Sequence, residues 1–403
     1  MIPLGEAQDY VLSGTTPVGT MSTPIADALG LVTAVPIMCN ELVPPFNNTA
    51  VDGYAVMAAD TAGAPVDLQV IGAIAAGEAP TIAITPGTAI RIMTGAPLPD
   101  GADAIVMVEE TTTAADDLTV TINSPVDVDA AVRRAGEDMQ PGQQVFPTGT
   151  LLQPGHLGVL ATLGLEEIVT HRRPTVGVIS TGDELIEGPQ QLAPGQIRDS
   201  NRRTLLSMVA QTGCEAIDLG LIRDDEAAVE AALRSGADQC DAIITSGGVS
   251  MGDFDFVKLV LSRIADMRWM QIAIKPAKPM AFGRLGRTPI FGLPGNPVSS
   301  MVSYELLARP GLRHMMGITG DERHRPRIRA TAEGPLPRRS DGKTHFARVN
   351  LRWVDGTATV RSAGGQGSHQ LSAMAGADAL AVLPDGEGAE VGDSVDIIAL
   401  HSD

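Results

Sequence analysis

Two glycine-rich stretches are the most informative part of the sequence: Ser246-Gly247-Gly248-Val249-Ser250-Met251-Gly252-Asp253-Phe254-Asp255 and, further along, Gly292-Leu293-Pro294-Gly295-Asn296-Pro297. Each follows an apolar β-like segment, residues 241–245 and 289–291, and each precedes a helical pattern. The first turn of a helix leaves backbone N–H groups unpaired at its positive end, which makes such a loop an anion site. Glycine allows close approach to a phosphate, or a positive φ. Two such loops predict a large ligand with several negative charges.

The composition places the chain among globular proteins of several domains. It has 403 residues, of which 44% are hydrophobic and 19% charged, enough for a substantial core. The net charge of -19 argues against nucleic acid as a partner. Any anion site must therefore depend on local cations, helix ends or a divalent metal ion held by carboxylates.

Cysteine spacing and hydropathy favour a cytoplasmic protein. Cys39, Cys214 and Cys240 are far apart and show no C-x-x-C spacing, so we expect neither a zinc site nor a disulfide framework. The first residues lack the apolar segment of a signal peptide, and no uncharged apolar run is long enough to cross a bilayer. We expect no membrane association.

The rhythm of the sequence predicts an α/β multidomain protein. Strand, loop and helix alternate from 173 to 319, which predicts a doubly wound parallel-sheet domain with ligands at the carboxyl ends of its strands. The expected strands are 175–180, 215–221, 241–245 and 289–291. The expected helices are 202–212, 225–235, 254–264 and 297–308.

Three further domains flank this region. Short β-like runs at 67–74, 89–93, 104–109 and 118–122 predict a small β domain over 44–133. Residues 320–403 predict a C-terminal β-barrel-like domain with strands at 327–332, 344–351, 357–362, 379–383 and 394–399. Helices at 5–12, 23–29 and 154–163 belong to a discontinuous linking and dimerisation domain formed by 1–43 and 134–172.

Several polar motifs could bind a ligand, and each has a plainer interpretation. Ser180-Thr181-Gly182-Asp183-Glu184-Leu185 follows the first strand and could be an ordinary capped turn. Arg198-Asp199-Ser200-Asn201 could simply begin the next helix. Asp253 and Asp255 offer the oxygen ligands that Mg²⁺ prefers, but acids there also stabilise a helix start.

Lysines and turn residues make the functional interpretation stronger. Lys275-Pro276-Ala277-Lys278-Pro279 holds two ammonium groups on a proline-framed turn between the glycine loops, which favours oxyanion binding over simple solvation. Asn48 and Asp52 lie in a segment too rich in turn residues for a core strand, and Thr94 adjoins a glycine. By composition, residues 365–369 would be a linker, and His369 lacks the sequence neighbours of a catalytic unit or a zinc site.

Together these segments resemble the molybdopterin molybdenumtransferase family, the MoeA type that also forms the gephyrin E domain. The resemblance extends from about residue 44 to 370. Its matching segments, in order, are PPFNNTAVDGYA, RIMTGAPLPDGADAIV, RRAGEDM, STGDEL, IRDSN, SGGVSMGDFDFVK, IKPAKPMAFG, GLPGNPVS and QGSH.

The resemblance implies a reaction and a set of site residues. Molybdate is inserted into adenylylated molybdopterin with Mg²⁺ support, and AMP and molybdenum cofactor are released. The implied catalytic residues are Asp255, Glu184, Asp52, Thr94 and Lys275, with Asp255 and Glu184 as metal ligands. The implied cofactor-binding residues are Gly247, Gly248, Ser250, Asp199, Asn201, Lys258, Lys278, Pro294, Gly295, Asn296, Ser299, Arg348 and Ser368. We expect Lys275, Lys278 and Asp255 to share one cleft.

The resemblance also implies partners and leaves alternatives. It implies a homodimer in which Asp52 and Thr94 complete the other subunit's cleft, and possible contacts with the molybdopterin adenylyltransferase and with molybdoenzyme chaperones. A gephyrin-like scaffold that binds partner peptides is one alternative, and adenylylation of molybdopterin is another. Ala277 stands where many relatives have glycine, and Gln271 where many have a basic residue. Both departures bear on anion affinity.

Overall fold

The computed structural model describes residues 1–115, 118–249 and 256–401. The chain divides into two compact units. Unit 1 comprises residues 1–34, 149–153 and 167–403, and unit 2 comprises residues 35–148 and 154–166. No helix in the described ranges is long and apolar enough to span a membrane.

The centre of unit 1 is a six-stranded sheet with the order β17-β14-β18-β22-β21-β19. The first four strands are parallel to one another, β21 is antiparallel to its neighbours β22 and β19, and β19 therefore runs in the same direction as the first four. The strands are β14 (Thr175–Thr181), β17 (Glu215–Ile222), β18 (Ala242–Ser246), β19 (Asp266–Gln271), β21 (Pro279–Leu285) and β22 (Thr288–Leu293). The sheet is therefore mixed, whereas the sequence pattern predicted only its parallel strands.

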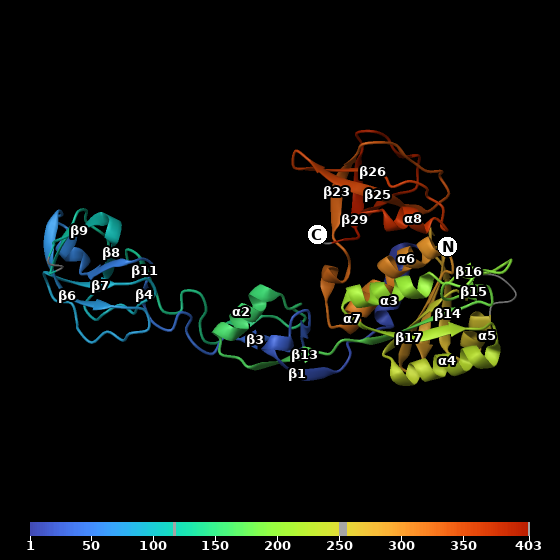
Figure 1. Cartoon of the computed structure of the whole chain (residues 1–403), viewed down its shortest axis with the longest axis horizontal. Helices are drawn as coiled ribbons and strands as arrows, with labels where there is room; N and C mark the ends of the chain where they lie inside the picture. The colour runs from blue at the N-terminus through green and yellow to red at the C-terminus, as the bar shows by residue number, and fades with distance from the viewer. Residues whose placement is uncertain (116–117, 250–255, 402–403) are drawn as a thin grey trace. The chain divides into compact units, whose positions relative to one another are not determined.

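Helices cover both faces of this sheet because its strands are apolar on both sides (Figure 1). Val178, Ile244 and Phe291 belong to one buried cluster, which also includes residues of α3 and α6. Ile179 and Ile290 belong to another, together with residues of α4 and α5. These helices are α3 (Asn201–Thr212), α4 (Glu226–Gln239), α5 (Phe256–Ile264) and α6 (Pro297–Ser303).

A π-helical turn, η4 (Tyr304–Ala308), continues α6 into α7 (Arg309–Met315). The helix predicted over 297–308 is therefore α-helical only in its first part. The N-terminal helix α1 (Leu4–Ser13) contacts both η4 and α7. A small sheet follows in the order β1-β13-β2, formed by β1 (Thr20–Pro24), β2 (Val32–Thr33) and β13 (Glu167–His171).

The helix predicted over 23–29 is wrong. Thr23 and Pro24 end strand β1, which pairs with β13, and only a 3₁₀ turn, η1 (Ile25–Asp27), follows. Thr23 lies opposite Ile168 in that pairing, and its side chain is buried. A partner so distant in sequence outweighs the local preference that Thr-Pro gives to a helix start.

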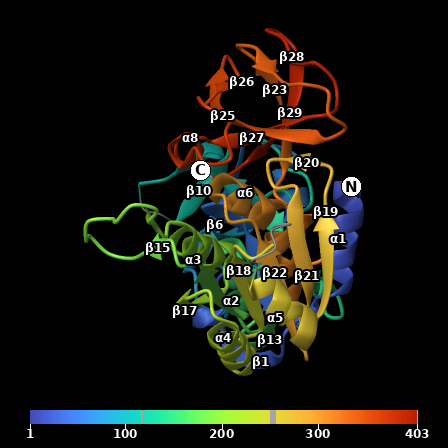
Figure 2. The same cartoon turned by 90° about the vertical axis from the view of Figure 1, so that its right-hand side faces the viewer.

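The C-terminal strands of unit 1 close into a small barrel, shown in red tones in Figure 2. The strand order is β20-β25-β26-β23-β29-β27, and an additional β25–β27 pairing closes the ring. The strands are β20 (Ile274–Lys275), β23 (Arg327–Ala332), β25 (Thr344–Val354), β26 (Thr357–Ser362), β27 (Ala379–Leu383) and β29 (Ser394–Ala399). The remaining elements are β24 (Leu336–Pro337), β28 (Gly388–Ala389), α8 (Leu371–Ala375) and η5 (Gly320–Arg323).

Unit 2 contains a second six-stranded sheet, in the order β8-β5-β7-β6-β10-β9. Its strands are β5 (Gly53–Val56), β6 (Val66–Ile74), β7 (Thr88–Ile92), β8 (Ala104–Met107), β9 (Thr111–Thr113) and β10 (Thr119–Ile122). The other elements are β3 (Ile37–Met38), β4 (Asn48–Thr49), β11 (Val132–Arg133), β12 (Gln144–Phe146), α2 (Pro154–Thr162), η2 (Ala58–Thr61) and η3 (Val108–Glu110). Two apolar clusters form its core.

Candidate active site

A cleft of about 790 Å³ lies at the carboxyl ends of three parallel strands of unit 1. β14 ends at Thr181, β18 at Ser246 and β22 at Leu293, and the loop after each strand forms part of the wall. Clefts of this size accept a nucleotide-sized ligand, and this edge of an open α/β sheet is where such ligands bind.

The first glycine loop has a backbone that only glycine adopts readily. Gly247 and Gly248 have φ of 95° and 77°, a region costly for residues with a side chain. A Cβ on Gly248 would lie 2.3 Å from Cβ of Val257. Ser250 of this loop lies outside the described residues.

The second glycine loop is joined to the first. The Gly247 N–H donates to the Leu293 carbonyl at 3.0 Å, and Pro294, Gly295 and Asn296 continue along the same wall into α6. The cleft therefore brings together these predicted ligand residues: Gly247, Gly248, Pro294, Gly295 and Asn296.

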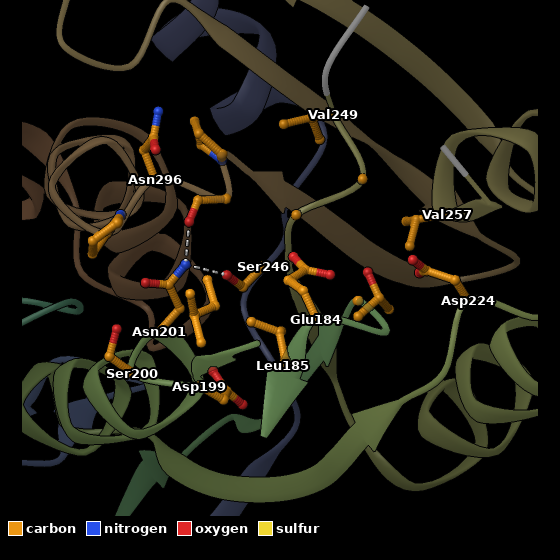
Figure 3. A pocket seen from close by; sticks show the side chains of 18 of the residues that line it. Glu184, Leu185, Asp199, Ser200, Asn201, Asp224, Ser246, Val249, Val257 and Asn296 are labelled. Atoms are coloured by element: carbon orange, nitrogen blue, oxygen red, sulfur yellow. Dashed lines mark hydrogen bonds between the residues drawn. The ribbon is translucent and has the colours of Figure 1, made fainter. Parts of the chain in front are cut away.

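Asn201 connects the start of α3 to both loops (Figure 3). Its Nδ2 donates to the Gly295 carbonyl at 2.7 Å and to Ser246 Oγ at 2.8 Å. Ser246 is the last residue of β18 and is buried. One amide therefore ties three segments together at the cleft wall.

Asp199 holds the neighbouring part of the wall through Arg202. Its carboxylate accepts hydrogen bonds from Arg202 Nε at 3.0 Å and from Ser180 Oγ at 3.1 Å. Arg202 is buried and also pairs with Asp218 and Glu187. Burial opposes the charge of Arg202, but the hydrogen bonds to Asp218 and Asp199 outweigh it and raise the pKa. Asp199 lines the cleft, but its carboxylate already accepts hydrogen bonds from Arg202 and Ser180.

Acidic groups are present on the same wall. Glu184 and Asp224 both line the cleft, and Asp224 exchanges long backbone–carboxylate hydrogen bonds with Asp183, at 3.3 and 3.4 Å. The described residues contain no cluster of three or more His, Cys, Asp or Glu side chains that could hold a metal ion. Asp253 and Asp255 lie outside the described residues.

Lys275 lies in a second cavity, of about 330 Å³, beside the barrel. β20 pairs in parallel with β25, so that Lys275 is opposite His345 and is held against the barrel. Gln366 and Arg338 are also part of the lining. Burial lowers the pKa of His345, the hydrogen bond to Asp341 opposes this, and the nearby charges of Arg338 and Lys275 lower it further. Lys275 and Arg339 add positive charge to this cavity, whereas Arg338 is paired with Asp341 and Asp385.

Arg348 is a buried cation on β25 without an acidic partner among the described residues. Its side chain is 0% exposed, and burial lowers its pKa. Nη2 donates to the carbonyls of Gly365 and Gly367, at 2.7 and 3.3 Å, whereas Nε and Nη1 have no hydrogen-bond partner. Buried polar groups are nearly always paired, so two unpaired guanidinium donors are unusual; Arg348 belongs to the described lining of neither cavity.

The two cavities share two segments of chain. In residues 275–279, Lys275 and Pro276 line the smaller cavity and Pro279 lines the larger one. In residues 366–369, Gln366 lines the smaller and His369 the larger. Lys275 therefore lines a different cavity from the glycine loops, because the β20–β25 pairing holds it against the barrel. The expectation that Lys275, Lys278 and Asp255 share one cleft stays a prediction, because Asp255 lies outside the described residues.

The remaining predicted oxyanion ligands lie beside these shared segments. Lys278 is exposed, and Ser299 is buried in the first turn of α6. The Ser368 carbonyl accepts a hydrogen bond from the Val298 N–H at 3.1 Å. This bond fixes the barrel loop to α6, next to Ser299.

Three family models match the chain in succession. They are the MoeA N-terminal region (domain I and II) at residues 2–164, the probable molybdopterin binding domain at 177–314, and the MoeA C-terminal region (domain IV) at 332–400. A molybdopterin molybdenumtransferase of Haemophilus influenzae is 38% identical over 387 residues, which cover 95% of this chain and 94% of that protein. The chain belongs to the molybdopterin molybdenumtransferase (MoeA) family.

Other relatives agree with membership of the MoeA family. The molybdopterin molybdenumtransferase 2 of Mycobacterium tuberculosis is 41% identical over 377 residues, 91% of each chain. A crystal structure of the molybdopterin biosynthesis moeA protein of Pyrococcus horikoshii superimposes with a TM-score of 0.84 at 28% identity, covering 99% of this chain and 100% of that one. A second structure of that protein gives a TM-score of 0.79 at 30% identity.

Two predicted residues of this MoeA-family chain form a pair in unit 2. Asp52 Oδ1 accepts hydrogen bonds from the Thr94 N–H at 2.7 Å and from Thr94 Oγ at 2.8 Å. The bond from the Thr94 backbone, followed by that from its hydroxyl, lowers the pKa of Asp52. The carboxylate is therefore held ionised and in a fixed orientation.

Lys258 is placed differently from the other predicted ligands of the MoeA family. Its Nζ lies 5.7 Å from the ring centroid of Trp269 on β19, a cation–π distance. Lys258 is part of neither cavity's described lining. Its predicted role in binding stays a prediction.

Several residues at the MoeA-family site were not predicted from the sequence to bind the ligand. His369, Asp224 and Ser246 line the larger cleft, and Gln366 orients Arg348 by accepting its backbone N–H at 2.9 Å. His369 makes no side-chain hydrogen bond or ion pair with the described residues. Glycines on either side gave residues 365–369 the composition of a linker, and only the fold brings them to the cleft.

Ala277 adopts a backbone conformation that favours glycine. Its φ is 76°, and its side chain is 3% exposed. We expect Ala277→Gly to raise the free energy of unfolding by up to about 1 kcal/mol, because relief of the left-handed backbone outweighs the loss of one methyl group. Urea unfolding measures this, with Ala281→Gly on the adjacent strand as a control that should destabilise. A clear loss of stability in Ala277→Gly would show that the methyl contacts dominate.

Proposed function

We propose that this protein inserts molybdate into adenylylated molybdopterin and releases AMP and molybdenum cofactor. Relatives that carry the molybdopterin molybdenumtransferase name match more than nine-tenths of its length. Both reactants are anions, and the chain itself carries a net charge of -19. Binding them together therefore requires local positive groups strong enough to overcome the overall field.

The buried guanidinium of Arg348 is the observation that carries this proposal. Its free Nε and Nη1 leave a desolvated cation able to donate to an oxyanion. Molybdate, a tetrahedral dianion, fits this chemistry, and Lys275 adds a second cation near the same barrel loop. Ser299 and Ser368 would supply hydroxyl donors. We assign the molybdate to this region.

We assign the adenylylated substrate to the larger cleft. The backbone donors of the two glycine loops suit its pyrophosphate, because fixed N–H groups stabilise phosphate charge without reorganising. The dithiolene end would then lie near the oxyanion, at the shared segments 275–279 and 366–369. In this account the protein forms no covalent intermediate, and catalysis depends on positioning and charge stabilisation.

A Mg²⁺ ion fits the acidic part of this cleft as a further element of the proposal. Glu184, and Asp255 of the first glycine loop, would supply oxygen ligands, together with the substrate's phosphates. Asp224 is on the same wall and could support it. When bound, Mg²⁺ would neutralise phosphate charge during cleavage of the anhydride.

The metal assignment predicts the behaviour of Glu184→Gln. We expect this isosteric change to raise the Mg²⁺ concentration needed for half-maximal AMP release by about tenfold, the usual order for loss of one charged ligand or its support. A titration of the initial rate against Mg²⁺ measures the shift. Glu187→Gln, a nearby acid that pairs with Arg202, is the control expected to keep the wild-type midpoint. Equal midpoints for wild type and Glu184→Gln would contradict the assignment.

We also propose that the active form is a homodimer. Asp52 and Thr94 would then approach the cleft from the other subunit, and their fixed, ionised pair would contact the cation–phosphate region. Light scattering on the purified chain tests this, and a mass corresponding to 41.9 kDa would contradict it. The adenylyltransferase and molybdoenzyme chaperones remain proposed partners.

One assay separates the proposed function from its alternatives. Purified protein is mixed with adenylylated molybdopterin and Mg²⁺, and AMP is followed with and without molybdate. The proposal predicts AMP release only with molybdate. Consumption of ATP without molybdate would instead support adenylylation. A scaffold would bind a peptide without releasing AMP, but the exposed large aromatics among the described residues are only Phe46 and Trp353, one in each unit.

A further inference from the structure

We propose that Asn201 recognises a hydrogen-bond donor of the substrate, an N–H or O–H group rather than a phosphate oxygen. The inference rests on the proposed function and concerns the larger cleft, where Asn201 is part of the wall. The groups that Asn201 can bind are set by which end of its amide faces each protein partner.

The orientation of the Asn201 amide follows from its partners. The Gly295 carbonyl can only accept, so the atom 2.7 Å from it must be the NH₂ group and not the amide oxygen. The second N–H donates to Ser246 Oγ at 2.8 Å. Both donors of the amide are thereby used within the protein.

The amide oxygen is the only part of this side chain left for a ligand. Oδ1 accepts no hydrogen bond from the described residues, and in Figure 3 it lies on the side of the amide away from Ser246. The two bonds prevent the amide from turning over to present its NH₂ group. Asn201 therefore differs from the glycine loops beside it, whose N–H groups suit phosphate.

A fixed acceptor selects among the chemical groups of the substrate. A deprotonated phosphate oxygen opposite Oδ1 would place two acceptors together, whereas a pterin N–H, an amino group or a ribose hydroxyl would satisfy it. A site built for such a donor discriminates strongly against ligands that lack it. The donor belongs either to the pterin half or to the nucleotide half, and the experiment distinguishes these two sources.

The test measures binding without turnover. The dissociation constant of adenylylated molybdopterin is measured in the absence of molybdate for wild type and Asn201→Ala. Inorganic pyrophosphate and AMP are then measured as competitors. We expect Asn201→Ala to weaken substrate binding by about tenfold, as for one lost hydrogen bond, and to change the inhibition constant of pyrophosphate by less than about threefold.

The AMP result identifies the source of the donor. A tenfold loss of AMP affinity in Asn201→Ala assigns the donor to the nucleotide half, and unchanged AMP affinity assigns it to the pterin half. Ser207→Ala, on the outer part of the same helix, is the matched control, because Ser207 donates only to the Arg203 carbonyl. If Asn201→Ala does not fold, Asn201→Gln, which keeps an amide but moves it by one methylene group, is measured in the same way.

Two results would overturn the proposal. In the first, pyrophosphate loses as much affinity as the substrate, which would mean that Asn201 acts only by holding the glycine loops in place. In the second, the variant binds the substrate as wild type does, which would mean that no contact exists. Both are independent of whether AMP is ever released, so failure of the proposed reaction would be seen separately.

Discussion

Replacement of Arg348 by methionine is expected to lower molybdate-dependent AMP release by about 100-fold or more, the usual loss when a preorganised charge donor is removed. The same change should raise the free energy of unfolding by up to about 2 kcal/mol, because it removes a buried cation with unpaired donors. Methionine fills a similar volume without charge. Loss of activity together with a gain in stability is the result that marks a group kept for function.

Initial rates and urea unfolding measure the two effects of Arg348→Met. Arg352→Met provides the control on the same strand, because Arg352 is exposed and has no buried donor without a partner. Arg352→Met should change neither the initial rate nor the free energy of unfolding by much. A fully active Arg348→Met would contradict the molybdate assignment. A strongly destabilised one would show that the bonds to the Gly365 and Gly367 carbonyls are its main contribution.

Replacement of Gly248 by alanine is expected to destabilise unit 1 by about 2–5 kcal/mol and to abolish substrate binding. About 1–2 kcal/mol comes from the positive φ, and the rest from overlap with Val257, because overpacking costs about 1–3 kcal/mol. The loop can relieve the overlap only by moving away from its place on the cleft wall. Chemical unfolding and substrate titration measure the two losses.

Gly286→Ala separates the cost of the positive φ from the cost of the overlap with Val257. Gly286 has φ of 61°, but an added Cβ would meet nothing within 4 Å. It lies in the turn between β21 and β22, away from the cleft lining. The control should therefore show the backbone cost alone, with normal binding. If Gly248→Ala is no worse than Gly286→Ala, the contact with Val257 is easily relieved.

The parallel strands and their helices could be predicted because each carries a strong local pattern. Buried strands such as 242–246 are nearly continuous apolar runs, and helix α4 has an Asp225 cap whose side chain accepts from the Ala228 N–H. β21 was not predicted, because Pro279 and the glycines at 283 and 286 resemble a loop. This segment is a strand because it pairs with β19 on one side and with β22 on the other.

The site was predictable from the sequence only in part. The glycine loops predicted an anion-binding cleft, because a glycine-rich loop between a strand and a helix presents unpaired backbone N–H groups. Arg348 and Ser368 were predicted as ligands only from the resemblance. No local feature of the sequence distinguishes a ligand-binding arginine in a barrel strand from any other arginine. What brings them to the site is long-range packing, namely the β20–β25 pairing and the bond between Val298 and Ser368.

The most direct test of the two-cavity account is an anomalous difference map, at the molybdenum absorption edge, of crystals soaked with molybdate. The account predicts a molybdenum peak beside the barrel loop, within hydrogen-bonding reach of Arg348 and near Lys275. A peak in the glycine-loop cleft, or ordered molybdate bound only at surface residues elsewhere, would contradict it.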